Sequence, residues 1–154
     1  MTEEEYRFVQ AVAKPFPGSR VLEVGSRNIN GTIRPIFQGC EYLGIDLYPG
    51  EGVDLVMDAE KMAFPDGFFD GVVSTSTLEH VARIWMACEE MQRVLKRGGW
   101  IIVTCCGIAF PQHDYPQDYW RITLATWPVL FPHIKIECAF DLGNNILGMK
   151  GFKP

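Results

Sequence analysis

The sequence lacks the segments by which a chain is exported or crosses a membrane. No apolar run approaches the roughly 18 residues of a spanning helix, and the N-terminus reads TEEEY instead of a basic stretch followed by an apolar one. These absences predict a soluble protein that is not exported. We therefore expect a cytoplasmic location and no membrane partner.

The sequence also lacks the cysteine spacing of a disulfide framework or a zinc site. Its cysteines are odd in number and include no C-x-x-C pair: Cys40, Cys88, Cys105, Cys106 and Cys138. A reducing setting is the simplest interpretation, with Cys105 and Cys106 as packing residues at a strand end. We expect no metal site and no cysteine nucleophile.

An excess of positive charge is missing as well. Lys and Arg number 14 against 19 Asp and Glu, which gives a net charge of −5. The chain therefore has no overall attraction for a phosphate backbone, and we expect no nucleic-acid partner. Its 154 residues, 47% of them hydrophobic, contain no repeat, linker or low-complexity segment. They predict one domain over residues 1–154.

Short apolar runs dominate the first two thirds of the chain. Five of them end mostly in small or acidic residues, near positions 20–24, 41–46, 53–57, 69–74 and 100–105. Continuous runs of this length suit strands that are buried on both faces. Between the last two, an apolar stripe from Val81 to Leu95 predicts a helix that Gly98 and Gly99 end.

The flanking segments complete an α/β pattern. Thr2 and Glu5 fit the capping box of a leading helix. Residues 107–123 mix prolines, aromatics and charges without a period, which predicts a long ordered loop. Three more elements are expected, a short helix over 124–131 and two strands over 133–140 and 144–152. Strands that alternate with helices predict a doubly wound, mostly parallel sheet of about seven strands, with an antiparallel hairpin last and ligands beyond the carboxyl ends of its strands.

Residues 21–46 carry the strongest functional signal. Glu23 closes an apolar run just before Gly25, and Asp46 closes the next run 46 − 23 = 23 residues later. This separation is near the ~20 residues at which a carboxylate meets a ribose diol. Gly25 and the small Ser26 allow the backbone to approach a ligand. No G-x-G-x-x-G is present, which argues against a dinucleotide. We expect a cofactor that contains a ribose.

Three segments resemble class I S-adenosylmethionine-dependent methyltransferases, particularly small members of the methyltransferase type 11 group. They are VLEVGSRNINGTIRP, YLGIDLYPGEGVDLVMDAEKMAFPDGFFDGVVSTSTLEHV and MQRVLKRGGWIIVT. The resemblance implies a Rossmann-like sheet in three α/β/α layers, S-adenosylmethionine as cofactor, and methyl transfer to a nucleophile. The first motif departs from D/E-x-G-x-G-x-G, because Arg27 and Ile29 occupy the later glycine positions.

The resemblance also implies which residues hold the cofactor. Asp46 would accept hydrogen bonds from the ribose hydroxyls, Leu47 would pack on the adenine, and Asp58 with Ala59 would meet the adenine edge. The whole candidate set is Glu23, Gly25, Ser26, Asp46, Leu47, Asp58, Ala59, Ser74 and Thr75. A purely structural tight turn at Gly25, and a helix N-cap or turn at Asp46, are the alternatives.

Two histidines are candidates for a general base, because the unperturbed pKa of imidazole is near 6.5. In the resembling family the position of His80 lies near the acceptor pocket, and His113 opens the segment HDYPQDYWR. That segment holds the candidate acceptor-binding residues Tyr115, Asp118, Tyr119, Trp120 and Arg121. The alternatives are a packed His80 ring and an Asp118–Arg121 ion pair that only pins the loop.

We therefore predict transfer of a methyl group from S-adenosylmethionine to a hydroxyl or amine of a small molecule of the sugar or natural-product type. The main alternative is a domain that binds S-adenosylmethionine or S-adenosylhomocysteine without turnover, and a nicotinamide oxidoreductase is a weaker one. The strand end STST, which replaces a Pro-Pro-aromatic segment, argues against DNA amino-methylation. A homodimer whose second subunit completes the pocket is a further prediction.

Overall fold

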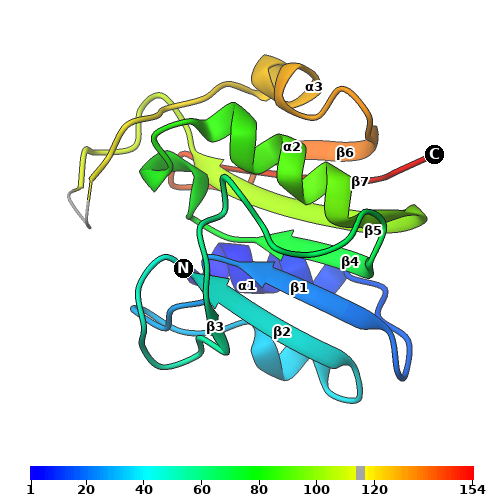
Figure 1. The fold of residues 1–154 in the computed structure, drawn as a ribbon. Coiled ribbons are helices and arrows are strands. Elements are labelled where there is room, and N and C mark those ends of the chain that lie inside the picture. The colour runs from blue at the N-terminus through cyan, green and yellow to red at the C-terminus, as the bar shows by residue number, and fades with distance from the viewer. Residues whose placement is uncertain (114–116) are drawn as a thin grey trace.

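The protein is built on one open sheet. Residues 1–113 and 117–154, which the computed structural model describes, form a seven-stranded sheet in the order β3-β2-β1-β4-β5-β7-β6 (Figure 1). The strands are β1 (Arg20–Val24), β2 (Glu41–Asp46), β3 (Leu55–Val56), β4 (Phe69–Ser74), β5 (Leu95–Cys106), β6 (Lys135–Asp141) and β7 (Ile146–Phe152). The first five run parallel, and β7 pairs antiparallel with both β5 and β6. The predicted mostly parallel sheet with a final antiparallel hairpin is confirmed.

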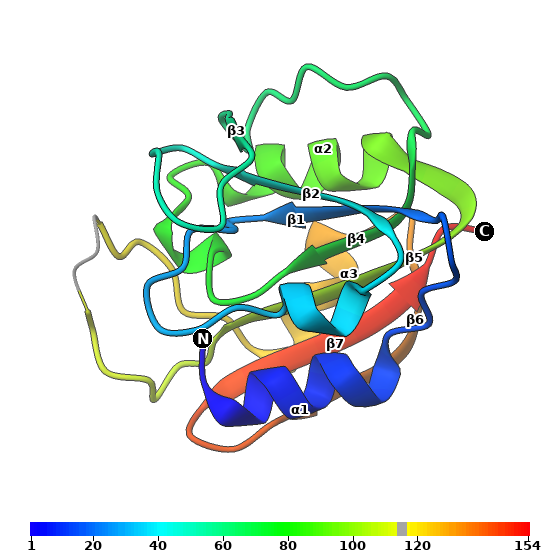
Figure 2. The same cartoon turned by 90° about the horizontal axis from the view of Figure 1, so that it is seen from below.

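Helices cover both faces of this sheet. On one face α1 (Glu3–Val12) and the one-turn helix η1 (Arg34–Phe37) pack over a core that contains Phe8 and Phe37. On the other, α2 (Ile84–Val94) and α3 (Trp127–Leu130) enclose a larger core that contains Met91 and Trp127. Figure 1 shows α2 and α3 in front of the sheet, and Figure 2 shows α1 alongside β7. The central strands are buried on both faces, as their continuous apolar runs predict.

Two connections between strands contain less helix than the alternation of strand and helix predicts. Between β1 and β2 the crossover holds η1 and no α-helix, and residues 57–68, between β3 and β4, form neither helix nor strand. Pro65 and Gly67 explain part of this, because they disfavour a helix. The Arg93 guanidinium compensates by donating to Met62 O (3.0 Å) and Phe64 O (2.7 Å), carbonyl groups that a helix would pair internally.

The long helix ends earlier than Gly98. α2 stops at Val94 because Leu95, fully buried, already pairs with Phe69 as the first residue of β5. Lys153 Nζ donates to Gln92 O (2.7 Å) and Leu95 O (2.9 Å). The ammonium group therefore pairs with carbonyl groups that the end of the helix leaves without partners. The prediction that the glycines end this helix is wrong by one turn, because strand pairing overrides helical periodicity.

The N-terminal helix begins with the predicted capping box. Thr2 Oγ1 accepts from Glu5 N (3.3 Å), and Glu5 Oε2 accepts from Thr2 N (2.7 Å). The Glu5 side chain is fully buried, and its other oxygen accepts hydrogen bonds from the hydroxyls of Ser76 (2.7 Å) and Thr104. One carboxyl group therefore ties α1 to β5 and to the loop after β4. Over the described residues, no helix is long and apolar enough to cross a bilayer.

Replacing Glu5 should destabilise the fold far more than replacing its exposed neighbour Glu3. Glu5→Ala leaves the Thr2 amide and the Ser76 and Thr104 hydroxyls without their acceptor, so we expect the free energy of unfolding to fall by roughly 2–4 kcal/mol. Glu3→Ala loses an exposed ion pair with Arg7 and should change it by less than about 0.5 kcal/mol. Urea unfolding of both variants checks this, and equal losses would contradict it.

Candidate functional site

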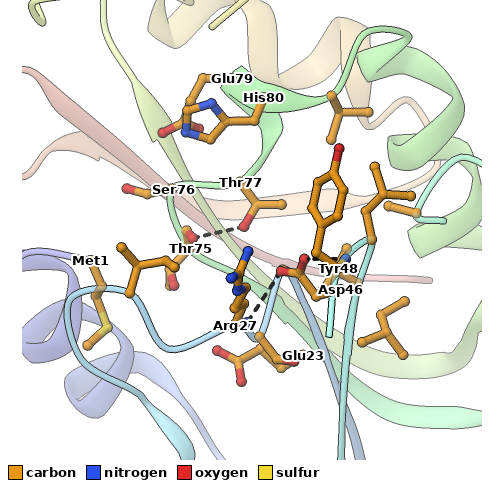
Figure 3. A pocket seen from close by; sticks show the side chains of 18 of the residues that line it. Met1, Glu23, Arg27, Asp46, Tyr48, Thr75, Ser76, Thr77, Glu79 and His80 are labelled. Carbon is orange, nitrogen blue, oxygen red and sulfur yellow. Dashed lines mark hydrogen bonds between the residues drawn. The ribbon is translucent and has the colours of Figure 1, made fainter. Parts of the chain in front are cut away.

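A cavity of about 800 Å³ opens at the carboxyl ends of β1, β2 and β4. Its walls come from residues within the segments 23–31, 45–48, 57–60 and 75–82, from the end of β5 and the loop that follows it, and from Ile146 in β7. Met1 and Thr2 also reach it from the start of α1. A volume of this size holds a cofactor-sized ligand. Figure 3 shows Glu79 and His80 at one end of the view, Glu23 at the other, and Arg27 and Asp46 between them.

Most of the residues singled out from the sequence line this cavity. They are Glu23, Gly25, Ser26, Asp46, Leu47, Asp58, Ala59, Thr75, His80, His113 and Tyr119. Ser74 does not line it; its hydroxyl donates to Val24 O (2.9 Å) and links β4 to β1. Asp118, Trp120 and Arg121 are also absent from the lining. Tyr115 lies outside the described residues.

The turn after β1 requires glycine at position 25. Gly25 has φ of +82°, a conformation that disfavours side chains, and a Cβ there would lie 1.9 Å from Thr77 Oγ1. The amides of Gly25 and Ser26 both donate to Ile45 O, at 2.9 and 3.0 Å, which pins the turn to β2. The backbone at Gly25 therefore packs closely against Thr77 in the loop after β4.

The irregular part of the first motif is held by side chains in place of glycines. Asn28 Oδ1 accepts from Gly31 N (2.9 Å), and Asn28 N donates to Glu51 O (2.8 Å). The side chain of Ser26 is buried, and its hydroxyl has no hydrogen-bond partner among the described residues. The hydroxyl lies beside β2, where a Cβ added at Gly44 would be 2.5 Å from its oxygen.

Asp46 ends β2 with its carboxylate at the cavity. Oδ2 accepts from Arg27 N (3.3 Å) and Oδ1 accepts from Tyr48 N (3.0 Å), so two backbone amides fix the group (Figure 3). A carboxylate offers about four acceptor positions, which leaves two for a ligand. This geometry suits a vicinal diol.

Glu23 lies deeper, almost fully buried at the end of β1. Burial raises its pKa to about 7, against the opposing effect of the hydrogen bond that Tyr42 Oη donates to Oε2 (2.6 Å). The group can therefore exist in either protonation state near neutral pH.

Two further acids that line the cavity, Asp58 and Glu79, differ in their hydrogen bonds and in their burial. Asp58 forms a turn, with Oδ1 accepting from Glu60 N (2.9 Å), and lines the wall beside Ala59. Glu79, in the one-turn helix η2 (Leu78–His80), is fully buried, and burial raises its pKa. Its Oε1 accepts from Cys106 Sγ (3.1 Å), while Oε2 has no hydrogen-bond partner among the described residues.

The two candidate bases lie together. The rings of His80 and His113 meet edge to face with their centroids 4.9 Å apart. His80 Nδ1 lies 2.5 Å from Gln117 O, which can only accept, so the hydrogen is assigned to Nδ1 and the lone pair to Nε2. His80 can therefore accept a proton through Nε2.

The loop after β5 is held by its own polar contacts. Arg121 donates through two nitrogens to the two oxygens of Asp118, each at 2.5 Å, and also to Phe110 O (3.0 Å). The hydrogen bonds from Arg121 lower the pKa of Asp118 to about 2. Trp120 Nε1 donates to Val81 O (2.8 Å). These contacts favour the interpretation in which the ion pair pins the loop, and they leave Tyr119 and His113 at the cavity.

Sequence reasoning assigned no site role to several lining residues, among them Ser76, Thr77 and Cys106. Ser76 has φ of +44°, held by the Glu5 carboxylate, and the Thr77 hydroxyl donates to Thr75 O (3.0 Å). The motif STSTLEH signals a polar strand end but not which side chains face inward. The position of Ser76 depends on Glu5 in α1, which lies more than 70 residues earlier in the chain.

An open, mostly parallel sheet with a ligand-sized cavity at its carboxyl edge defines a Rossmann-like domain. The chain belongs to the family whose model is described as "Methyltransferase domain", the type 11 group that its motifs resemble; the model matches residues 22–103.

Relatives of known name agree with this family. A fatty-acid O-methyltransferase of Mycolicibacterium smegmatis is 31% identical over 126 residues, which cover 73% of this chain and 44% of that protein. The chain spans less than half the length of the curated relatives it matches.

Solved structures share the fold at low sequence identity. Burkholderia thailandensis 1,6-didemethyltoxoflavin-N1-methyltransferase, solved with 1,6-didemethyltoxoflavin and S-adenosylhomocysteine bound, has a TM-score of 0.77 at 15% identity over 98% of this chain and 77% of that one. The cyclase SpnF has a TM-score of 0.79 at 16% identity over 97% of this chain and 79% of that one. The fold thus occurs with more than one chemistry.

Gly25→Ala should destabilise the protein more than Gly18→Ala. Both glycines have positive φ, +82° and +78°, so each substitution costs about 1–2 kcal/mol of backbone strain. A methyl group at position 18 meets nothing within 4 Å, whereas one at position 25 overlaps Thr77 and adds a further loss of roughly 1–3 kcal/mol. Urea unfolding measures both, and identical losses would show that the Thr77 contact relaxes without cost.

Glu23 should make stability fall as pH rises from about 4.5 to 7. Its raised pKa means that the folded state keeps a proton that the unfolded chain, with a glutamate pKa of about 4.3, releases. The stabilisation is complete below pH 4 and lost above 7, with an upper limit on the order of 4 kcal/mol. Glu23→Gln should flatten this slope in urea titrations between pH 4.5 and 8. Glu41→Gln, at an exposed glutamate, should keep the wild-type slope.

Proposed function

We propose that this domain binds S-adenosylmethionine and transfers its methyl group to a small-molecule acceptor. The observation that carries the proposal is Asp46, an acid fixed by two amides at the carboxyl end of β2, opposite the glycine turn of the family's first motif. Family membership and the named relatives support the same activity.

The charges of the cavity fit a cationic cofactor. Among its described lining residues the carboxyl groups of Asp46, Asp58 and Glu60 outnumber the single guanidinium of Arg27, while burial raises the pKa of the two further acids, Glu23 and Glu79. S-adenosylmethionine carries a sulfonium and an ammonium group against one carboxylate, so an acidic cavity attracts it. The ribose hydroxyls would donate to Asp46, whose carboxylate is fixed by two backbone amides.

The adenine would lie against the segments that follow β2 and β3. Leu47 lines the cavity with about half of its surface exposed, which provides an apolar face for a ring. Asp58 keeps Oδ2 for the adenine amino group while Oδ1 accepts from Glu60 N, and Ala59 follows it at the same wall.

The bound cofactor supplies an electrophilic methyl group on a sulfonium. This chain would align the acceptor in line with that methyl group and, where the nucleophile is protonated, remove its proton. His80 is the proposed base, because its Nε2 lone pair is available at the cavity, and His113 lies beside it. Phe110 and Tyr119 line the same end and would exclude water.

The proposed acceptor group is a hydroxyl or amine, on a small molecule of sugar or natural-product type. Because one relative is a fatty-acid O-methyltransferase, a panel of acceptors should also contain fatty acids. Tyr115, Asp118, Trp120 and Arg121 stay part of the proposed acceptor side, with the last three acting through the shape of the loop. A second copy of the chain as the partner that completes the pocket is also proposed, and light scattering of the purified protein tests it.

Calorimetric titration with S-adenosylmethionine and S-adenosylhomocysteine tests the cofactor. We expect micromolar binding of both, weakened at least tenfold in Asp46→Asn, because the amide presents a donor to a ribose hydroxyl in place of an acceptor. Asp66→Asn, at an exposed aspartate of the Arg93 ion pair, is the matched control and should bind as the wild type does. No binding to folded, ligand-free protein would overturn the proposal.

A second arm separates catalysis from binding alone. Protein that binds the cofactor is incubated with labelled S-adenosylmethionine and an acceptor panel of fatty acids, sugars, amines and phenolic natural products. Transfer that is lost in His80→Asn, with cofactor affinity unchanged, supports the enzyme and its base. Tight binding with no transfer to any acceptor favours the non-catalytic binding domain.

A further inference from the structure

Three side chains that can bind a metal meet at the acceptor end of the cavity. A carboxylate oxygen of Glu79, the sulfur of Cys106 and a ring nitrogen of His113 all lie within 4.8 Å of one another. They come from η2, from the last residue of β5 and from the loop beyond it. All three residues line the cavity.

Glu79 and Cys106 are the buried members of this cluster, and Glu79 has no exposed surface. Its Oε1 accepts from Cys106 Sγ (3.1 Å), and its Oε2 has no hydrogen-bond partner among the described residues. A buried carboxyl oxygen without a partner is destabilising, and a cation is the ligand that satisfies it best.

His113 has a carboxylate beside its ring, as metal-binding histidines often have. Its Nδ1 lies 3.4 Å from Asp118 Oδ2 and 3.5 Å from Pro111 O, both of which can only accept, so the lone pair is assigned to Nε2. Asp118 is itself fixed, since Arg121 binds both of its oxygens and His113 N donates to Oδ2 (2.8 Å). A carboxylate behind a histidine is the usual support of a metal-binding imidazole.

We propose that Glu79, Cys106 and His113 bind a divalent transition-metal ion of the zinc type, with one coordination position open to the cavity. One oxygen, one sulfur and one nitrogen form a mixed donor set that suits zinc and its neighbours, and three protein ligands leave a fourth position free. The thiol proton that Cys106 shares with Glu79 would leave as the metal binds.

The proposed site departs from the expectation of no metal, which rested on cysteine spacing alone. Its ligands are 106 − 79 = 27 and 113 − 106 = 7 residues apart, so they do not form a short metal-binding motif that the sequence would reveal. If the domain is a methyltransferase as proposed, the open position lies where the acceptor would bind, and an acceptor oxygen or nitrogen can occupy it.

Metal titration of the full chain tests the site without cofactor or acceptor. Reduced, chelator-treated protein is titrated with zinc by calorimetry and with cobalt(II) by absorption, since a thiolate ligand gives cobalt a charge-transfer band. We expect one zinc ion bound per chain with micromolar affinity or better, and a thiolate band with cobalt. Cys106→Ser, Glu79→Gln and His113→Gln should each weaken binding at least tenfold, and Cys106→Ser should abolish the band.

Two matched controls exclude adventitious binding. Cys138→Ser and His133→Gln make the same kinds of change outside the cluster, at a half-buried cysteine and an exposed histidine. Both variants should bind zinc as the wild type does. Absence of zinc binding or of the thiolate band in folded wild-type protein overturns the site, whatever happens to the variants. So does binding that survives the three substitutions or fails equally in the controls. In those cases Cys106 and Glu79 form only a hydrogen-bonded pair.

Discussion

The parallel pairing of β1 between β2 and β4 is the constraint on which the rest of the structure depends. Glu23 lies opposite Gly44 in β2 and Val73 in β4, so the three strands end at one edge and release their loops on the same side. Gly25 must then turn beneath Thr77, and its amide pairs with Ile45 O. Asp46, the glycine turn and the STST segment meet because of this register, and a slip by one residue would separate them.

In two of the connections between strands, arginine side chains donate the hydrogen bonds that backbone amides would donate in a crossover helix. Arg93 supplies donors to the carbonyls of Met62 and Phe64, and Arg34 donates to Gly52 O (3.0 Å) in the segment after β2. Each guanidinium carries several donors in a fixed plane and can therefore serve a loop whose carbonyls have no helix to pair with. This is one way in which a chain of 154 residues completes a seven-stranded sheet.

The sequence was sufficient for what depends on neighbours along the chain. The buried strands, the capping box of Thr2 and Glu5, and the final hairpin follow from local pattern. Glu23 and Asp46, chosen by their spacing for a ribose contact, lie at two strand ends and line one cavity. Local pattern failed at Leu95, where pairing with Phe69 ends a helix that periodicity would extend.

Long-range contacts account for what the sequence could not predict about the site. Nothing near Glu79 in sequence indicates that Cys106 and His113 lie beside it, because β5 and the loop after it determine that proximity. Nor does Ser76 reveal that a carboxylate from α1 fixes its strained backbone. For the HDYPQDYWR segment the sequence left two interpretations open, ligand binding or an Asp118–Arg121 ion pair, and the structure contains the ion pair.

The two edges of the sheet have a consequence for how this protein can associate. β3 pairs through only two residues, and the register between β6 and β7 shifts between Ile136 and Cys138, where Glu137 forms an ion pair with Lys150. A very short strand at one border and a charged irregularity at the other are poor templates for a strand from another chain. Neither border of the sheet therefore favours end-to-end growth of the sheet into a fibre.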